Sequence, residues 1–220
     1  MLGIWGELAD LAELAVPSAC PGCGAPGSPC AECRREFARP PVRVAPRVHV
    51  PAPTWSCGSY SGPRRSVVLA AKELGDVSAR TVMGAVVGAA LLRLVAEGEV
   101  AHPSQGRAIL VPAPTRASAA RRRGGDPVTA ACEVAAERVA GARVAAGLLR
   151  TAEGAEDSSG LTAVGRRRNI AGRIVPSGTV EGPVLLVDDV LTTGATAAHS
   201  VLVLASLGVP VAGVIVFSHA

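Results

Sequence analysis

Aromatic residues are scarce in this chain of 220 residues, in which Phe, Trp and Tyr together make up 2%. A platform on which successive nucleic-acid bases stack needs several exposed rings, so the composition argues against a dedicated single-strand binder. A secretion signal is also lacking, because no basic region precedes the first apolar stretch and Glu7, Asp10 and Glu13 lie within it. We therefore expect the protein to stay in the cytosol.

Lysine is nearly absent, since Lys72 is the only lysine among 22 basic residues. An ammonium group is a compact point charge and differs in this from a guanidinium group. A phosphate or substrate contact would explain why this one lysine is kept, and chance is the alternative. The formal net charge of +4 fits phosphorylated small molecules as well as nucleic acid.

Apolar residues make up 49% of the chain, and a chain of this length buries roughly 70% of its unfolded surface. The expected organisation is one good core with a small appendage. Residues 201–218 are uncharged and long enough to raise the question of a membrane span, but Gly208, Pro210 and Gly213 interrupt them. This stretch predicts a helix, a turn and a buried strand, and we expect no membrane partner.

Four of the six cysteines form two C-x-x-C pairs, Cys20 with Cys23 and Cys30 with Cys33. Each pair forms a knuckle whose thiolates point at a common centre, so together they supply the four tetrahedral ligands of structural zinc. A disulfide is disfavoured in the cytosol, and catalytic zinc would leave one coordination position open. The pattern predicts a small zinc-binding module within residues 1–40, which also include an amphipathic helix at 2–16.

The remainder divides into a short stretch rich in Pro and Arg and a long alternating pattern. Residues 41–54 are predicted to form an extended linker. Strands then alternate with helices over residues 55–220, which predicts an α/β fold with a mostly parallel sheet covered by helices on both faces. The predicted strands are 54–60, 107–112, 143–150, 183–188 and 211–217, and the predicted helices are 64–74, 78–97, 119–140 and 195–207.

The most informative stretch of the chain is 184–196, VLLVDDVLTTGAT. Four apolar residues followed by Asp188 and Asp189 predict a strand that is buried on both faces and ends in a polar site. The two acids can accept hydrogen bonds from a vicinal diol or hold magnesium. The loop that follows can aim backbone N–H groups at a phosphate; it consists of Thr192, Thr193, Gly194, Ala195 and Thr196. Diol, metal and phosphate together indicate a ribose phosphate.

Three other well-known motifs do not match the residues of this stretch. A nucleotide-triphosphate P-loop needs a lysine after its last glycine, and Ala195 stands there. A dinucleotide fingerprint needs three spaced glycines, and only Gly194 is present. A phosphoaspartyl hydrolase of the Asp-x-Asp kind needs an acid at Val190. The remaining alternative is a purely structural one, an apolar core strand followed by an ordinary acidic turn.

The whole stretch resembles the phosphoribosyl-pyrophosphate (PRPP) motif of type I phosphoribosyltransferases. The resemblance implies that Asp188 and Asp189 bind the ribose hydroxyls, with magnesium bridging ribose and pyrophosphate, and that residues 192–196 bind the 5-phosphate. It also implies a pyrophosphate contact for Arg116, after the strand at 107–112. Arg168 lies in a long irregular segment at 151–172 that is typical of active-site lids, and the arginines of such a lid can close over a pyrophosphate. The alternative for this segment is a disordered surface loop.

Nearly the whole chain resembles the ComF-type proteins, in which a zinc ribbon precedes a domain like the type I phosphoribosyltransferases. This resemblance rests on the four cysteines, the PRPP motif, Lys72, Val111-Pro112-Ala113-Pro114, Arg123-Gly124, Gly160-Leu161, Arg167 or Arg168, and Asn169. The chain departs from the family pattern at Gly125, Asp126 and Pro127, where an aromatic residue, Asn and Gln are usual, and at Ser158, where Gln is frequent.

The reaction implied by the resemblance is displacement of pyrophosphate from C1 of PRPP by a nitrogen nucleophile. It needs no nucleophilic side chain, which agrees with the lack of a Ser/His/Asp or Cys/His constellation. ComF-type proteins are also associated with natural transformation, so an accessory role with single-stranded DNA or competence proteins is one alternative. A regulator that senses PRPP without turnover is another. The sequence names neither the acceptor nor the oligomeric state.

Overall fold

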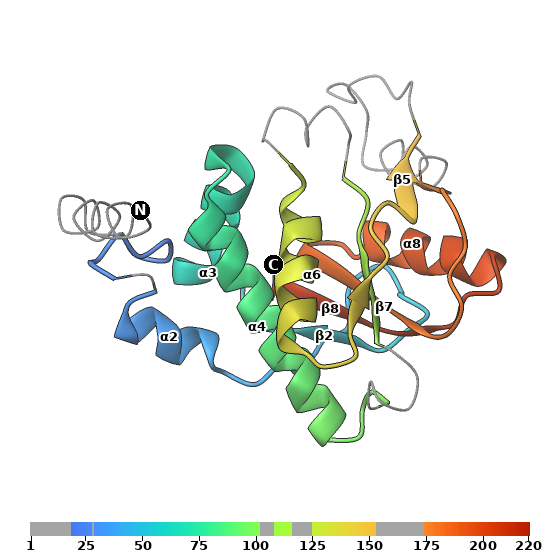
Figure 1. The fold of residues 1–220 in the computed structure, drawn as a ribbon, viewed down its shortest axis with the longest axis horizontal. Helices are drawn as coiled ribbons and strands as arrows, with labels where there is room; N and C mark the ends of the chain where they lie inside the picture. The colour runs from blue at the N-terminus through green and yellow to red at the C-terminus, as the bar shows by residue number, and fades with distance from the viewer. Residues whose placement is uncertain (1–18, 28, 102–107, 116–124, 153–173) are drawn as a thin grey trace, which may run out of the picture.

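The computed structural model describes residues 19–27, 29–101, 108–115, 125–152 and 174–220. Its centre is a six-stranded sheet in the order β1-β2-β8-β7-β3-β4 (Figure 1). The strands are β1 (Val42–Arg43), β2 (Thr54–Ser56), β3 (Ile109–Pro112), β4 (Arg143–Val144), β7 (Val184–Leu191) and β8 (Val211–His219). All neighbours are parallel except β1 and β2, so the predicted α/β class with a mostly parallel sheet is confirmed.

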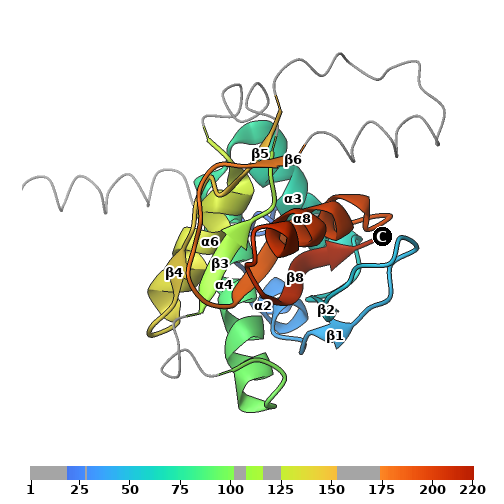
Figure 2. The same ribbon diagram turned by 90° about the vertical axis from the view of Figure 1, so that its right-hand side faces the viewer.

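Helices cover both faces of this sheet (Figures 1 and 2). The helices are α3 (Gly62–Leu69), which continues into the π-helix η1 (Ala70–Leu74), α4 (Val77–Ala96), α6 (Pro127–Arg138) and α8 (Ala195–Ser206). Alternation along β7 explains the two layers, because successive side chains of a strand point to opposite faces. Leu185 and Val187 belong to the core cluster with α3, α4 and α6, whereas Val184 and Leu186 belong to the cluster with α8.

Side-chain caps fix where two of the helices begin. The Asp76 carboxylate accepts a hydrogen bond from the Ala79 backbone N–H at 2.9 Å and starts α4. Asp126 does the same for α6 by accepting from the Thr129 N–H at 3.0 Å, and Pro127 occupies the first turn, where its missing N–H costs nothing. Within the described residues, α4 alone is long and apolar enough to span a membrane, and 56% of its apolar window is buried inside the protein.

Several predicted boundaries differ from the observed ones. The strand expected to end at Asp188 runs on to Leu191, so both acids lie within β7 and not at its exit. The single strand expected at 143–150 is two, because Gly147 at φ 73° turns the chain between β4 and β5 (Leu149–Thr151). β5 pairs with β6 (Ile174–Pro176) in a separate antiparallel sheet. Residues 201–218 form the end of α8, a turn and β8, as expected.

The stretch expected to be an extended linker packs closely on the sheet. It contributes β1, which pairs with β2, and the Val44 N–H donates to the Thr54 carbonyl at 2.9 Å. Val50 is buried in the core cluster with α8. Before it, α2 (Ala31–Phe37) follows the cysteine knuckles and lies beside α3 (Figure 1). The helix expected at 2–16 lies outside the described residues, as do Arg116, Arg123-Gly124, Ser158 and residues 160–169.

Candidate functional site

The two acids of the motif lie on β7 in different environments. Asp189 is 4% exposed, and its Oδ2 is 2.7 Å from the Nζ of Lys72 in η1. Asp188 is half-buried, and its Oδ1 accepts a hydrogen bond from the Asp189 N–H at 2.8 Å. The one lysine of the chain therefore contacts an acid that the sequence singled out.

The surroundings of Asp188 disfavour its charged form. Burial, followed by the adjacent charge of Asp189, raises the pKa of Asp188 from 3.8 to about 8. The backbone N–H of Asp189 and the charge of Lys72 act in the opposite direction without cancelling the shift. A carboxyl group in this state gains most from a ligand that brings positive charge or hydrogen-bond donors.

The loop at 192–196 opens α8, and residues far away in the sequence hold its shape. Gly194 has φ 87° and ψ 0°, a left-handed conformation at the position that begins the helix. A Cβ atom at Gly194 would lie 2.7 Å from the Pro46 Cβ and 3.0 Å from the Val48 carbonyl oxygen. The Val48 N–H donates to the Thr193 carbonyl at 2.8 Å. Thr192 and Thr193 are exposed beside a helix N-terminus, which favours an anion.

A cavity of about 410 Å³ lies where β3 ends, and the described residues that line it include Pro114, Thr115, Asp126, Thr129, Arg150 and Val175. The Ala113 N–H donates to the Val187 carbonyl at 2.8 Å, so this loop begins directly beside Asp188. The exits of β3 and β7 therefore share one edge of the sheet, as expected for a ligand site in a parallel fold. Arg116, expected to contact pyrophosphate here, follows directly and lies outside the described residues.

Asp126 is a site residue whose role the sequence reasoning missed. One of its carboxylate oxygens accepts from the Thr115 hydroxyl at 2.8 Å, and the other accepts from the backbone N–H and hydroxyl of Thr129. The carboxylate thus ties the loop after β3 to the start of α6. The signal was present in the sequence, because aspartate followed directly by proline is typical of a helix start.

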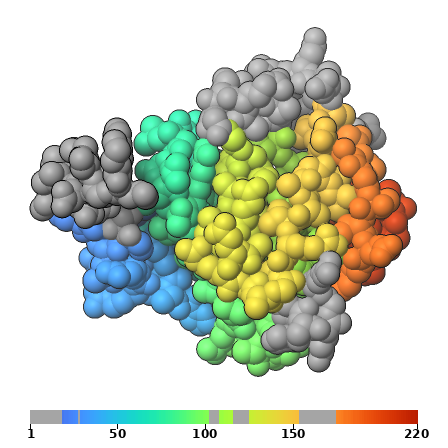
Figure 3. Space-filling view, in the orientation of Figure 1, coloured from blue at the N-terminus to red at the C-terminus, as the bar shows by residue number. Residues whose placement is uncertain are grey.

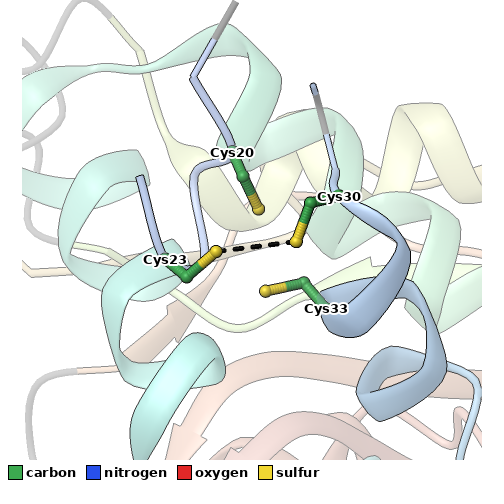
Figure 4. A group of neighbouring side chains, drawn as sticks. All are labelled: Cys20, Cys23, Cys30 and Cys33. Atoms are coloured by element: carbon green, nitrogen blue, oxygen red, sulfur yellow. Dashed lines mark hydrogen bonds between the residues drawn. The ribbon is translucent and has the colours of Figure 1, made fainter. Parts of the chain in front are cut away.

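The four paired cysteines converge on one point (Figure 4). Their sulfur atoms all lie within 4.8 Å of one another, and those of Cys23 and Cys30 are 3.5 Å apart. Zinc–sulfur bonds of about 2.3 Å place the corners of a tetrahedron ~3.8 Å apart, so the cluster has the size to hold zinc. Burial raises the pKa of the Cys20 thiol, but backbone hydrogen bonds near Cys30, Gly22 and Cys23 outweigh it and lower the pKa to about 6.

The cysteine module packs directly on the main body, at the end of the molecule next to α3 (Figure 3). The Arg64 side chain is 1% exposed and lies between two rings, 5.4 Å from that of Phe37 in α2 and 5.5 Å from that of Phe217 in β8. Its Nη2 donates to the Glu36 carbonyl at 3.0 Å. A cation held between two rings and a carbonyl joins the module to the sheet.

Cys57 and Cys132, which the spacing left without partners, are both buried, and their burial raises the pKa of each thiol. They behave as small core residues, as expected. Chemically, the described site combines two unlike carboxylates, a lysine, a hydroxyl-bearing loop at a helix N-terminus and a neighbouring cavity. A scan of protein-family models finds no match to this chain, and a search of curated proteins finds none either.

Proposed function

We propose that this chain is a ComF-type, PRPP-binding protein that transfers phosphoribosyl to a nitrogen acceptor and releases pyrophosphate in a magnesium-dependent reaction. The observation that carries the proposal is the common edge of the sheet at which β7 and β3 end. Asp188 and Asp189 lie on β7, the loop at 192–196 opens α8, and the cavity lies at the end of β3, where the Ala113 N–H donates to the Val187 carbonyl of β7. In this proposal, the two acids recognise the diol, the loop recognises the 5-phosphate and the cavity recognises the pyrophosphate group.

The roles of the residues follow from their chemistry. Half-buried Asp188 accepts hydrogen bonds from the ribose hydroxyls, with Asp189 beside it. The backbone N–H groups of the loop and its exposed Thr192 and Thr193 hydroxyls hold the 5-phosphate at the positive end of α8. The cavity after β3 receives the pyrophosphate or the acceptor. Carboxylate oxygens are ligands that magnesium prefers; bound there through PRPP, it would neutralise charge on the leaving pyrophosphate.

The proposed transfer balances without a nucleophilic side chain. The bond between C1 of the ribose and the pyrophosphate oxygen breaks, and the oxygen keeps the electron pair. The bond between C1 and the acceptor nitrogen forms, and that nitrogen releases a proton. The protein contributes by positioning the two reactants and by stabilising the departing polyanion, which fits a site built of carboxylates, hydroxyls and a helix N-terminus.

Calorimetric titration of the zinc-loaded protein with PRPP, with and without magnesium, tests the proposal. We expect magnesium-dependent binding that is weaker for ribose 5-phosphate, and loss of binding when Asp188→Asn and Asp189→Asn are combined. Glu97→Gln is the matched control, because it removes one acid that is exposed and paired with Arg93 away from the site. If the folded wild-type protein does not bind PRPP, the proposal is wrong.

Pyrophosphate release separates transfer from binding alone. A protein that binds PRPP but releases no pyrophosphate with any nitrogen acceptor would be a PRPP-sensing regulator. One observation favours testing this second function. Asp126 stands where the ComF pattern has an amide, and its carboxylate is occupied as the cap of α6 and the anchor of Thr115.

A further inference from the structure

The sequence suggested that Lys72 contacts a phosphate or a substrate, but its described contact is with Asp189. We infer that Lys72 is a positioning residue, which acts on the bound ribose phosphate through the Asp189 carboxylate and not by touching a phosphate. This inference rests on the proposed function. Three observations carry it: the 2.7 Å contact, the burial of the acid and the irregular helix that places the lysine.

The contact lies in a largely enclosed place. The Asp189 side chain is 6% exposed and that of Lys72 is 29% exposed. An ionised carboxylate at this depth is stable only when it is paired, because removal from water costs several kcal/mol per charge. Removing one partner therefore leaves the other charge buried and unpaired, whereas a surface ion pair would contribute little.

The backbone around Lys72 is specialised for this placement. α3 does not end normally but widens into the π-helix η1 at Ala70–Leu74, with Lys72 at its centre. Gly75 then takes a left-handed conformation, and the Asp76 N–H returns to the Ala70 carbonyl at 3.1 Å. π-helical turns are rare, cost regular hydrogen bonding, and occur frequently at functional sites. From this turn the Lys72 side chain reaches Asp189 on β7.

The ion pair with Lys72 gives the two adjacent acids different roles. The ammonium group occupies Oδ2 of Asp189, which fixes that carboxylate and compensates one of two neighbouring negative charges. Asp188 has no such counter-ion at hydrogen-bond distance among the described residues. Lys72 thus fixes the Asp189 carboxylate, while half-buried Asp188 remains available to the hydroxyls or to magnesium.

A double-mutant cycle tests whether Lys72 acts through Asp189. In the wild-type background, Lys72→Met is expected to lower PRPP affinity about tenfold, in the range measured for directly coupled residues. In the Asp189→Asn background, the same change is expected to alter affinity less than about twofold. Arg65→Met is the matched control, because it removes one positive charge from an exposed position of α3 and should leave affinity within about twofold.

Two further measurements keep the test decisive if Asp189→Asn alone prevents binding. Lys72→Met should weaken ribose 5-phosphate by the same factor as PRPP, because Asp189 serves the ribose side. Thermal unfolding should show the Lys72→Met, Asp189→Asn double variant melting above Lys72→Met alone, since the double variant leaves no buried charge unpaired.

The possible failures are distinguishable. A wild-type protein that does not bind PRPP overturns the proposed function itself. Wild-type binding with additive losses in the cycle, or with a loss confined to PRPP and absent for ribose 5-phosphate, overturns only the role of Lys72 and identifies it as a direct pyrophosphate contact. Equal melting temperatures for the Lys72→Met single variant and the double variant would show that the pair is not coupled in the folded protein.

Discussion

The position of Gly194 allows a quantitative test of how the proposed phosphate loop is held. Replacing Gly194 with Ala forces an L-residue into a left-handed conformation at φ 87°, which costs roughly 1–2 kcal/mol. The new Cβ would also meet the Pro46 side chain at 2.7 Å and the Val48 carbonyl oxygen at 3.0 Å. Overpacking of this kind typically costs about 1–3 kcal/mol more, so urea denaturation should show a total loss of roughly 2–5 kcal/mol.

The same helix supplies a matched control at its other end. Gly208 has φ 71°, and nothing lies within 4 Å of the Cβ that a substitution would add. Gly208→Ala should therefore lose only the conformational term of roughly 1–2 kcal/mol and should leave PRPP affinity unchanged. Equal losses of unfolding free energy for the two variants would refute the conclusion that contacts with residues 46–48 hold the loop in its conformation. Unchanged PRPP affinity in Gly194→Ala would separate the loop from the proposed phosphate site.

Two further predictions concern the metal and the acids. Combining Cys20→Ser with Cys23→Ser should abolish zinc binding, measured as metal content. It should also destabilise the module, because metal contributes on the order of 10 kcal/mol to the folding of such modules. Retained metal would contradict the assignment. Because the pKa of Asp188 is raised to about 8, its carboxyl group stays protonated in the folded protein between pH 4 and 8. The unfolded chain releases this proton in the same range, so the contribution of Asp188 to the free energy of unfolding falls as pH rises. In magnesium-free buffer, Asp188→Asn should therefore gain stability relative to wild type between pH 5 and pH 8 by more than ~1.4 kcal/mol, the equivalent of one pKa unit; a pH-independent difference in urea denaturation would show that this pKa is normal.

The features that could be predicted from the sequence depend on residues that lie close together in the chain. The apolar run before Asp188 identified a buried central strand, and β7 is the second-longest strand of the described sheet. The spacing of the cysteines predicted a tetrahedral cluster, and the four sulfur atoms converge as expected. In both cases, the residues that decide the structure are close in sequence, and the geometry follows from a strand period or a knuckle.

The features that were missed depend on contacts between distant segments. The proline-rich composition of residues 41–54 predicted an extended linker, and composition does not reveal that Val48 donates to Thr193 or that Val50 enters the core. The contact of Lys72 with Asp189 spans more than a hundred residues and depends on a π-helical turn. No periodicity in the sequence indicates such a turn, because it differs from a regular helix by a single residue.

The cysteine cluster and the two acids of β7 are connected by one continuous element. α3 and η1 run from Gly62 to Leu74. At one end, Pro63 lies against Gly22 of the first cysteine knuckle, and Arg64 stacks between Phe37 and Phe217. At the other end, Lys72 holds Asp189 on β7, and the strand next to it carries Phe217. A metal bound by the four cysteines would order the knuckles and would therefore also fix the surface against which the helix rests. For this reason, loss of zinc is expected to weaken the Lys72–Asp189 contact as well as the module itself.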